Sequence, residues 1–156
     1  MRITQGNLAI TYEALGRHEE AILIKRDVYY GNLRLNGNEH YDTIREAFNY
    51  ARSLACLQRF EEAKSLLHKT IPVARCVLGE GALITLSLRG IYGQALCDDP
   101  AATCDDLREA VTMLEDVAPI ARRVLGSSHP LTKVIEGDLR NARAVLRDKE
   151  CSPKDD

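Results

Sequence analysis

The fold is decided by the stretch Gly16-Arg17-His18-Glu19-Glu20-Ala21, which returns 42 residues later as Gln58-Arg59-Phe60-Glu61-Glu62-Ala63. A weaker copy follows, Leu107-Arg108-Glu109-Ala110, whose alanine lies 47 residues after Ala63. The same 47-residue interval relates a second block, Pro72-Val73-Ala74-Arg75-Cys76-Val77-Leu78-Gly79, to Pro119-Ile120-Ala121-Arg122-Arg123-Val124-Leu125-Gly126. Self-similarity at about 20–50 residues is the signature of a solenoid. The chain is therefore predicted to be a repeat protein that serves as a binding scaffold.

Apolar residues spaced three and four apart predict helices rather than strands. We expect an all-α, right-handed superhelical solenoid of about three helix pairs, followed by a closing C-terminal helix. The pairs are expected at about 3–36, 42–78 and 83–125, and the closing helix at 131–148. These elements form one predicted repeat domain over residues 1–148. Residues 149–156 are expected to be a disordered tail.

Local signals predict where the helices begin and bend. Gly16 is expected to end the first helix as a C-cap glycine. Asp42 or Thr43 can cap the third helix, and Thr103 or Asp105 can cap the helix that ends near Leu125. Two prolines, Pro72 and Pro119, fall inside predicted helices, and each is expected to introduce a kink there.

Composition narrows the classes of function. The 156 residues carry a formal net charge of −2, which argues against a general nucleic-acid binder or a binder of acidic lipid surfaces. No apolar run approaches the roughly 20 residues needed to span a bilayer. The five cysteines are odd in number and widely spaced, as free thiols in a reducing compartment would be. No signal peptide is visible at the N-terminus, so we expect a cytoplasmic location.

The motif Asn7-Leu8-Ala9, followed by Gly16-Arg17-His18-Glu19-Glu20-Ala21, resembles the first half of a tetratricopeptide repeat. The ending Val124-Leu125-Gly126-Ser127-Ser128-His129-Pro130-Leu131-Thr132 resembles the 42-residue variety of kinesin light chains. The resemblance covers roughly residues 3–147. It implies a protein-interaction scaffold in which small residues let paired helices approach closely. Those small positions are Ala9 with Ala21, Ala51 with Ala63, and Gly93 with Ala110.

The resemblance also implies a peptide-binding groove along the first helix of each pair. Asn7 and Asn49 are equivalent, and an amide there can donate to and accept from a peptide unit. An alternative is that each Asn hydrogen-bonds a neighbouring helix. Arg45, Phe48 and Arg52 share one helix face, which suits an acidic segment with an apolar anchor or is simply a solvated basic face. Gln94 and Asn141 take the place of Arg52 in later repeats, so the groove is expected to become neutral.

The residues indicate no catalytic centre, cofactor or metal site. The histidines and cysteines lack the spacing that zinc ligands need, and no nucleophile has an identifiable base. The predicted partner is therefore a protein or peptide segment, acidic with apolar anchors, rather than a nucleic acid or a membrane. Two alternatives stay open, a repeat domain of a larger enzyme or NTP-driven regulator, and a standalone enzyme. The sequence leaves the oligomeric state undetermined.

Overall fold

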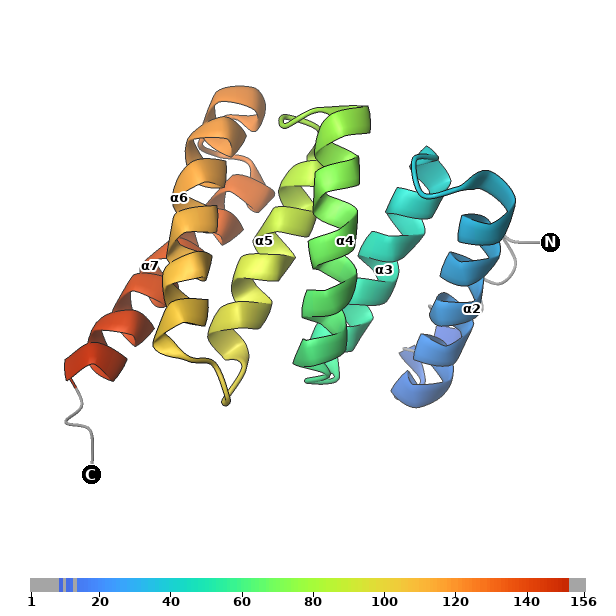
Figure 1. Ribbon diagram of the computed structural model, residues 1–156, viewed down its shortest axis with the longest axis horizontal. Helices are drawn as coiled ribbons and strands as arrows, with labels where there is room; N and C mark the ends of the chain where they lie inside the picture. The colour runs from blue at the N-terminus through green and yellow to red at the C-terminus, as the bar shows by residue number, and fades with distance from the viewer. Residues whose placement is uncertain (1–8, 10, 13, 152–156) are drawn as a thin grey trace. The chain divides into compact units, whose positions relative to one another are not determined.

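The computed structural model describes residues 9, 11–12 and 14–151 (Figure 1). It divides into two compact units, Met1–Leu78 and Gly79–Asp156, which we describe separately. All regular structure in the described part of the chain is helical, and no strand occurs there. The all-α repeat fold predicted from the sequence is confirmed.

The first unit contains helices α2 (His18–Asn36), α3 (Tyr41–Cys56) and α4 (Phe60–Leu78). Ala9, Thr11, Tyr12 and Ala14 are also helical. Helix α3 packs against both α2 and α4. Its apolar face buries Tyr50 and Leu54 against Ile22 of α2 and Ala63 of α4, which forms the core of this unit. Helices α2 and α4 end at Asn36 and Leu78, where the first and second predicted pairs end.

The second unit contains helices α5 (Leu83–Asp98), α6 (Cys104–Leu125) and α7 (Pro130–Cys151). Each of these helices packs against the other two. The core is built mainly on α6, whose Leu114, Val117 and Ala121 pack with Leu86 of α5 and Ile135 of α7. Helices α4 and α6 continue through the internal prolines, so neither proline ends its helix.

The repeated stretches Gly16–Ala21 and Gln58–Ala63 build the same turn twice. Gly16 and Gln58 occupy equivalent positions and both adopt positive φ, 73° and 58°. In each turn the next residue donates its backbone N–H to a carbonyl five residues back, Arg17 to Tyr12 and Arg59 to Leu54, at 2.8 and 2.9 Å. Each arginine then forms an ion pair with the glutamate three residues on. The sequence repeat is therefore a repeat of backbone geometry and of side-chain pairing.

Two helix starts differ in how well the sequence predicted them. Thr103 caps α6 as expected, in a reciprocal capping box with Asp106. The cap of α3 is neither Asp42 nor Thr43, because the His40 ring nitrogen Nδ1 accepts the Asp42 backbone N–H at 3.2 Å. The equivalent ring of His129 accepts the Leu131 N–H at 3.1 Å. Histidine thus serves as the capping acceptor in both places.

The small residues at the predicted helix-pair contacts are all buried: Ala9, Ala21, Ala51, Ala63, Gly93 and Ala110. At Gly93 the contact is especially close, since an added Cβ would lie 2.8–3.0 Å from three Leu114 side-chain carbons. Such distances are too short for carbon atoms in van der Waals contact. Close approach therefore explains why α5 carries glycine at this position.

The chain end corrects one prediction. Helix α7 continues through Lys149 and Glu150 to Cys151, whereas residues 149–156 were expected to be a disordered tail. Two contacts dock this last turn. Lys149 donates to the Ala102 carbonyl, and Glu150 accepts from Arg108 of α6 at 2.8 Å. Residues 152–156 lie outside the described part of the chain.

Candidate protein-binding face

Four of the predicted site residues lie on α3, where they share one face through spacings of three, four and seven. Arg45 and Arg52 are exposed, while Phe48 and Asn49 are half-buried. The burial of Thr43, Ile44, Ala47 and Ala51 toward the neighbouring helices fixes the orientation of α3. As a result, this set of four faces outward as one surface, which we call the α3 face.

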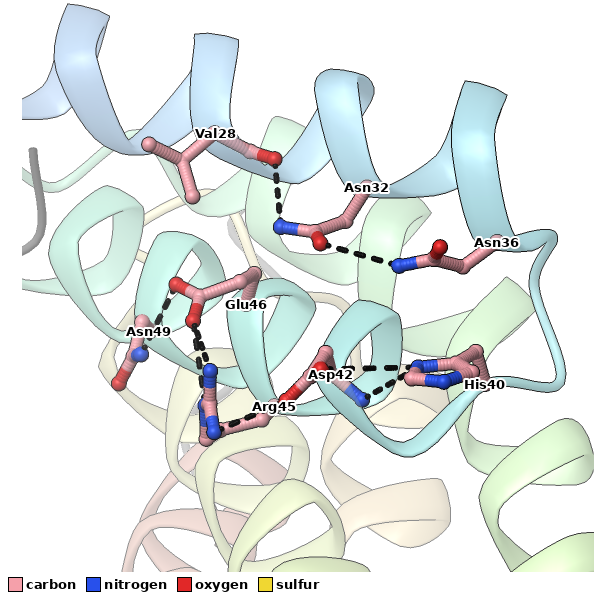
Figure 2. Close-up of polar contacts among 8 residues, drawn as sticks. All are labelled: Val28, Asn32, Asn36, His40, Asp42, Arg45, Glu46 and Asn49. Atoms are coloured by element: carbon pink, nitrogen blue, oxygen red, sulfur yellow. Dashed lines mark hydrogen bonds and ion pairs between the residues drawn. The ribbon is translucent and has the colours of Figure 1, made fainter. Parts of the chain in front are cut away.

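Carboxylates on α3 already engage two members of this face (Figure 2). The Arg45 guanidinium lies 3.0 Å from both Asp42 Oδ1 and Glu46 Oε1. The Asn49 amide donates to Glu46 Oε2 at 3.2 Å. Asn49 therefore hydrogen-bonds one turn back in its own helix rather than a neighbouring helix. Its carbonyl oxygen and its second amide N–H are the parts that a ligand could use.

Arg52 is the available cation of the α3 face. Its guanidinium carbon lies 5.9 Å from the centroid of the Phe48 ring, within cation–π range. Among the described residues it has no ion pair or hydrogen bond. An exposed guanidinium beside a half-buried aromatic ring presents charge and apolar surface at one place.

The second unit places Gln94 on α5 and Asn141 on α7, both exposed. Gln94 hydrogen-bonds Asp98. Asp98 in turn lies close enough to Asp138 of α7 to raise the pKa of Asp138. Burial is the larger cause, and together the two effects raise the pKa of Asp138 to about 6. Burial also raises the pKa of Cys97, to about 11. Gln94 thus hydrogen-bonds one of two neighbouring carboxylates, and the neutral character predicted for this part of the groove stays a prediction.

Asn7, the remaining predicted site residue, lies outside the described residues. The other six divide between the units, with Arg45, Phe48, Asn49 and Arg52 in the first unit and Gln94 and Asn141 in the second. Their alignment along one continuous groove stays a prediction.

Sequence reasoning missed two buried cations. Arg89 of α5 is only 3% exposed and donates to Glu80 Oε2 at 3.0 Å and to the Met113 sulfur at 3.2 Å. Lys25 of α2 is buried and donates to Ser53 Oγ of α3 at 2.7 Å. The 42-residue repeat offered a signal for the burial of Arg89, because it aligns Arg89 with the buried Ala47. Both cations are satisfied inside the fold and act in structure rather than in binding.

A cavity of about 200 Å³ lies in the first unit, among Tyr29 and Leu33 of α2, Ile44 of α3 and Val73 of α4. Thr43 also lines it, and the buried Thr43 hydroxyl has no hydrogen-bond partner among the described residues. Thr132, its equivalent in α7, has the same unpaired hydroxyl. The unpaired hydroxyl thus recurs at equivalent positions of α3 and α7, while Thr85, the equivalent residue of α5, has an interaction.

Within the described residues, no group of three or more His, Cys, Asp or Glu side chains could hold a metal ion. None of the described helices combines the length and apolar character needed to cross a membrane.

Comparisons with known proteins agree with this architecture. Residues 102–131 match the family model of the tetratricopeptide repeat. Two similar solved structures are forms of a Podosopora anserina protein described as a kinesin light chain with nearly identical TPR-like repeats. Each of these structures is 22% identical to this chain in sequence. The matched region covers 96% of this chain and 68% of the other chain, with TM-scores of 0.78 and 0.76. No curated protein matches the sequence. The chain therefore has a tetratricopeptide-type repeat fold like that of kinesin-light-chain repeats.

Proposed function

We propose that the chain is a non-catalytic protein-interaction module that binds an extended or helical protein segment carrying acidic and apolar residues. The repeat fold supports this proposal, because stacked helix pairs present long side-chain surfaces to a partner. Proteins of this fold commonly mediate protein–protein interaction.

The observation that carries the proposal is the pairing of Arg52 with Phe48 on the α3 face. Arg52 is exposed and has no carboxylate partner among the described residues, so binding an acidic side chain would break no existing ion pair. Phe48 offers an apolar contact 5.9 Å away. Arginine and aromatic side chains are the residue types that most often dominate binding energy at protein interfaces.

Several contacts must act together. A neutral hydrogen bond contributes about 0.5–1.5 kcal/mol and a charged one about 1.5–3 kcal/mol. Micromolar affinity needs about 8 kcal/mol. Arg52 and the free carbonyl oxygen of Asn49 cannot supply this alone. The segment is therefore expected to reach further predicted groove residues, with Asn7, Gln94 and Asn141 as the candidates.

The test begins with peptides selected from a display library on the intact chain. Their affinities are then measured by fluorescence anisotropy for the wild type and for Arg52→Glu. Arg34→Glu is the matched control, because Arg34 is an exposed α2 residue without a partner among the described residues. We expect Arg52→Glu to weaken binding by about tenfold, or 1.4 kcal/mol. The control should change affinity less than twofold, and added salt should weaken wild-type binding.

A selected peptide that is unaffected by Arg52→Glu, by Asn49→Ala and by salt would contradict the assignment to the α3 face. The Asp98–Asp106 segment would then be the better candidate for its binding site.

A further inference from the structure

Helix α7 carries a face whose chemistry is reversed relative to the equivalent faces of α3 and α5. The repeat intervals of 42 and 47 residues align the three helices residue by residue. In α3 and α5 the aligned residues are buried and apolar: Ile44, Ala51 and Leu54, then Leu86, Gly93 and Leu96. In α7 they are exposed and cationic: Lys133, Arg140 and Arg143.

The change at Arg140 alters what can pack on this face. Its equivalent in α5 is Gly93, which lies so close to Leu114 of α6 that a single added Cβ would approach within 3.0 Å. A helix that paired with α7 as α6 pairs with α5 would meet the Arg140 side chain at this point. The face is therefore unsuited to the close helix pairing found within the repeats.

The cations of this face fall into two groups. Arg143 is neutralised by Glu115 of α6, at 2.6 Å. By contrast, Lys133, Arg140 and Arg147 have no ion pair or hydrogen bond among the described residues. These three are seven residues apart, which places them in one stripe along the helix with a spacing of about 10 Å. We call this set the cationic stripe.

The stripe borders a hollow that also offers an apolar contact. A hollow of about 440 Å³ is lined by Arg140, Arg143, Leu146 and Arg147. The acidic residues of α7 are engaged elsewhere, since Glu136 pairs with Arg122, Glu150 pairs with Arg108 and Asp138 faces Asp98. Asp148, on the same helix, has an interaction of its own. The stripe thus combines three available charges with one apolar side chain.

We propose that the cationic stripe binds an acidic amphipathic helix of a partner protein. Carboxylates seven residues apart on such a helix would repeat at about 10 Å, which matches the spacing of Lys133, Arg140 and Arg147. An apolar residue of the same face would contact Leu146. A polyphosphate suits the surface less well, because the second unit has fourteen Asp and Glu against ten Lys and Arg.

The probe for the test is a synthetic helix about three heptads long, with glutamates seven residues apart and leucines beside them. Binding to the intact chain is followed by fluorescence anisotropy. Arg140→Glu/Arg147→Glu should weaken binding of this peptide by at least about tenfold. A second peptide, with lysines in place of the glutamates, should bind the variant protein more tightly than it binds the wild-type protein. The matched control is Arg34→Glu/Arg123→Glu, which reverses two exposed cations away from the stripe that also lack partners among the described residues.

Binding of the lysine peptide to the Arg140→Glu/Arg147→Glu variant supports the proposal and also shows that the variant is folded. Equal losses in the control variant, or no loss in the stripe variant, would overturn it. Tighter binding of a single-stranded RNA oligonucleotide than of the acidic helix, with the same dependence on Arg140 and Arg147, would also overturn it. The stripe and the α3 face are on different helices, so Arg52→Glu should leave the affinity of this probe unchanged.

Discussion

At the scale of single residues, the surroundings of Asp138 differ from what its sequence position suggests. It is equivalent to Asn49, yet it faces a second carboxylate, Asp98, across the contact between α5 and α7. Burial and this like charge both disfavour its ionised form, which raises its pKa to about 6. An unfolded chain would ionise the same group near pH 3.9. Between about pH 4 and pH 6, Asp138 is therefore protonated in the folded state and ionised in the unfolded state.

This difference predicts how stability depends on pH. Asp138 contributes stability below about pH 4, and that contribution is lost as the pH rises through about 6. Asp138→Asn should therefore raise the free energy of unfolding above pH 7 and have little effect near pH 4. Full burial would make the gain about 3 kcal/mol, but solvent screening of this half-exposed group reduces it to about 1 kcal/mol.

Urea unfolding at several pH values measures this effect. Asp27→Asn is a suitable control, because Asp27 pairs with Arg26 on the surface of α2, where an ion pair contributes little. Equal gains for both variants, or a gain for Asp138→Asn that does not depend on pH, would show that the raised pKa of Asp138 is not the cause.

At the scale of helices, the distance between packed helices determines how replacing a glycine at their contact changes the free energy of unfolding. Gly93 lies against Leu114, whereas an added Cβ at Gly31 of α2 would meet nothing within 4 Å. Gly93→Ala should lower the free energy of unfolding by about 1–3 kcal/mol, since the buried leucine or the helices must move. Gly31→Ala should raise it by about 0.5–1 kcal/mol, because alanine favours the helix and restricts the unfolded chain.

Chemical denaturation of the two variants beside the wild type makes the comparison. The opposite signs of the two changes in the free energy of unfolding matter more than their sizes, because both substitutions have the same intrinsic effect on helix propensity. A stabilised Gly93→Ala variant would mean that α5 and α6 can separate without cost. The closeness of the pair would then not be the reason for the glycine.

The helices could be predicted from the sequence because their signals are local. The Gly16 and Gln58 turns, the Thr103 cap and the periodic apolar residues all act within a few positions. What the sequence could not show depends on contacts between distant residues. Asp98 and Asp138 meet only because α5 packs on α7, and Lys149 extends α7 by reaching back to Ala102.

Sequence spacing also predicted that Arg45, Phe48, Asn49 and Arg52 share one helix face, and the structure places all four on one face of α3. Their role in binding stays a prediction. Which of them is available for a ligand depended on side-chain choices that spacing does not determine. Glu46 could have pointed into solvent, but it binds Arg45 and Asn49. This choice leaves Arg52 as the cation of the α3 face that has no ion pair among the described residues.

At the scale of the whole chain, the depth of burial varies along the helices. Helix α2 buries five residues, of which Lys25 and Asn32 are polar, and α7 buries only Thr132, Ile135 and Ala142. Helix α5, in contrast, buries nine residues. The stability of a repeat array is the sum of contributions from each repeat and from each contact between neighbours. Helices α2 and α7 should therefore open locally more often than α5.

Amide hydrogen exchange read by mass spectrometry tests this gradient. We expect α2 and α7 to exchange faster than α5 and α6, with protection rising toward the helices that bury most apolar surface. Gly31→Ala should slow exchange in α2 without changing α6, because local stabilisation propagates only through neighbouring contacts. Protection in α2 equal to that in α6 would mean that the chain opens only as one cooperative unit. In that case the polar burial of Lys25 and Asn32 would not weaken the first unit.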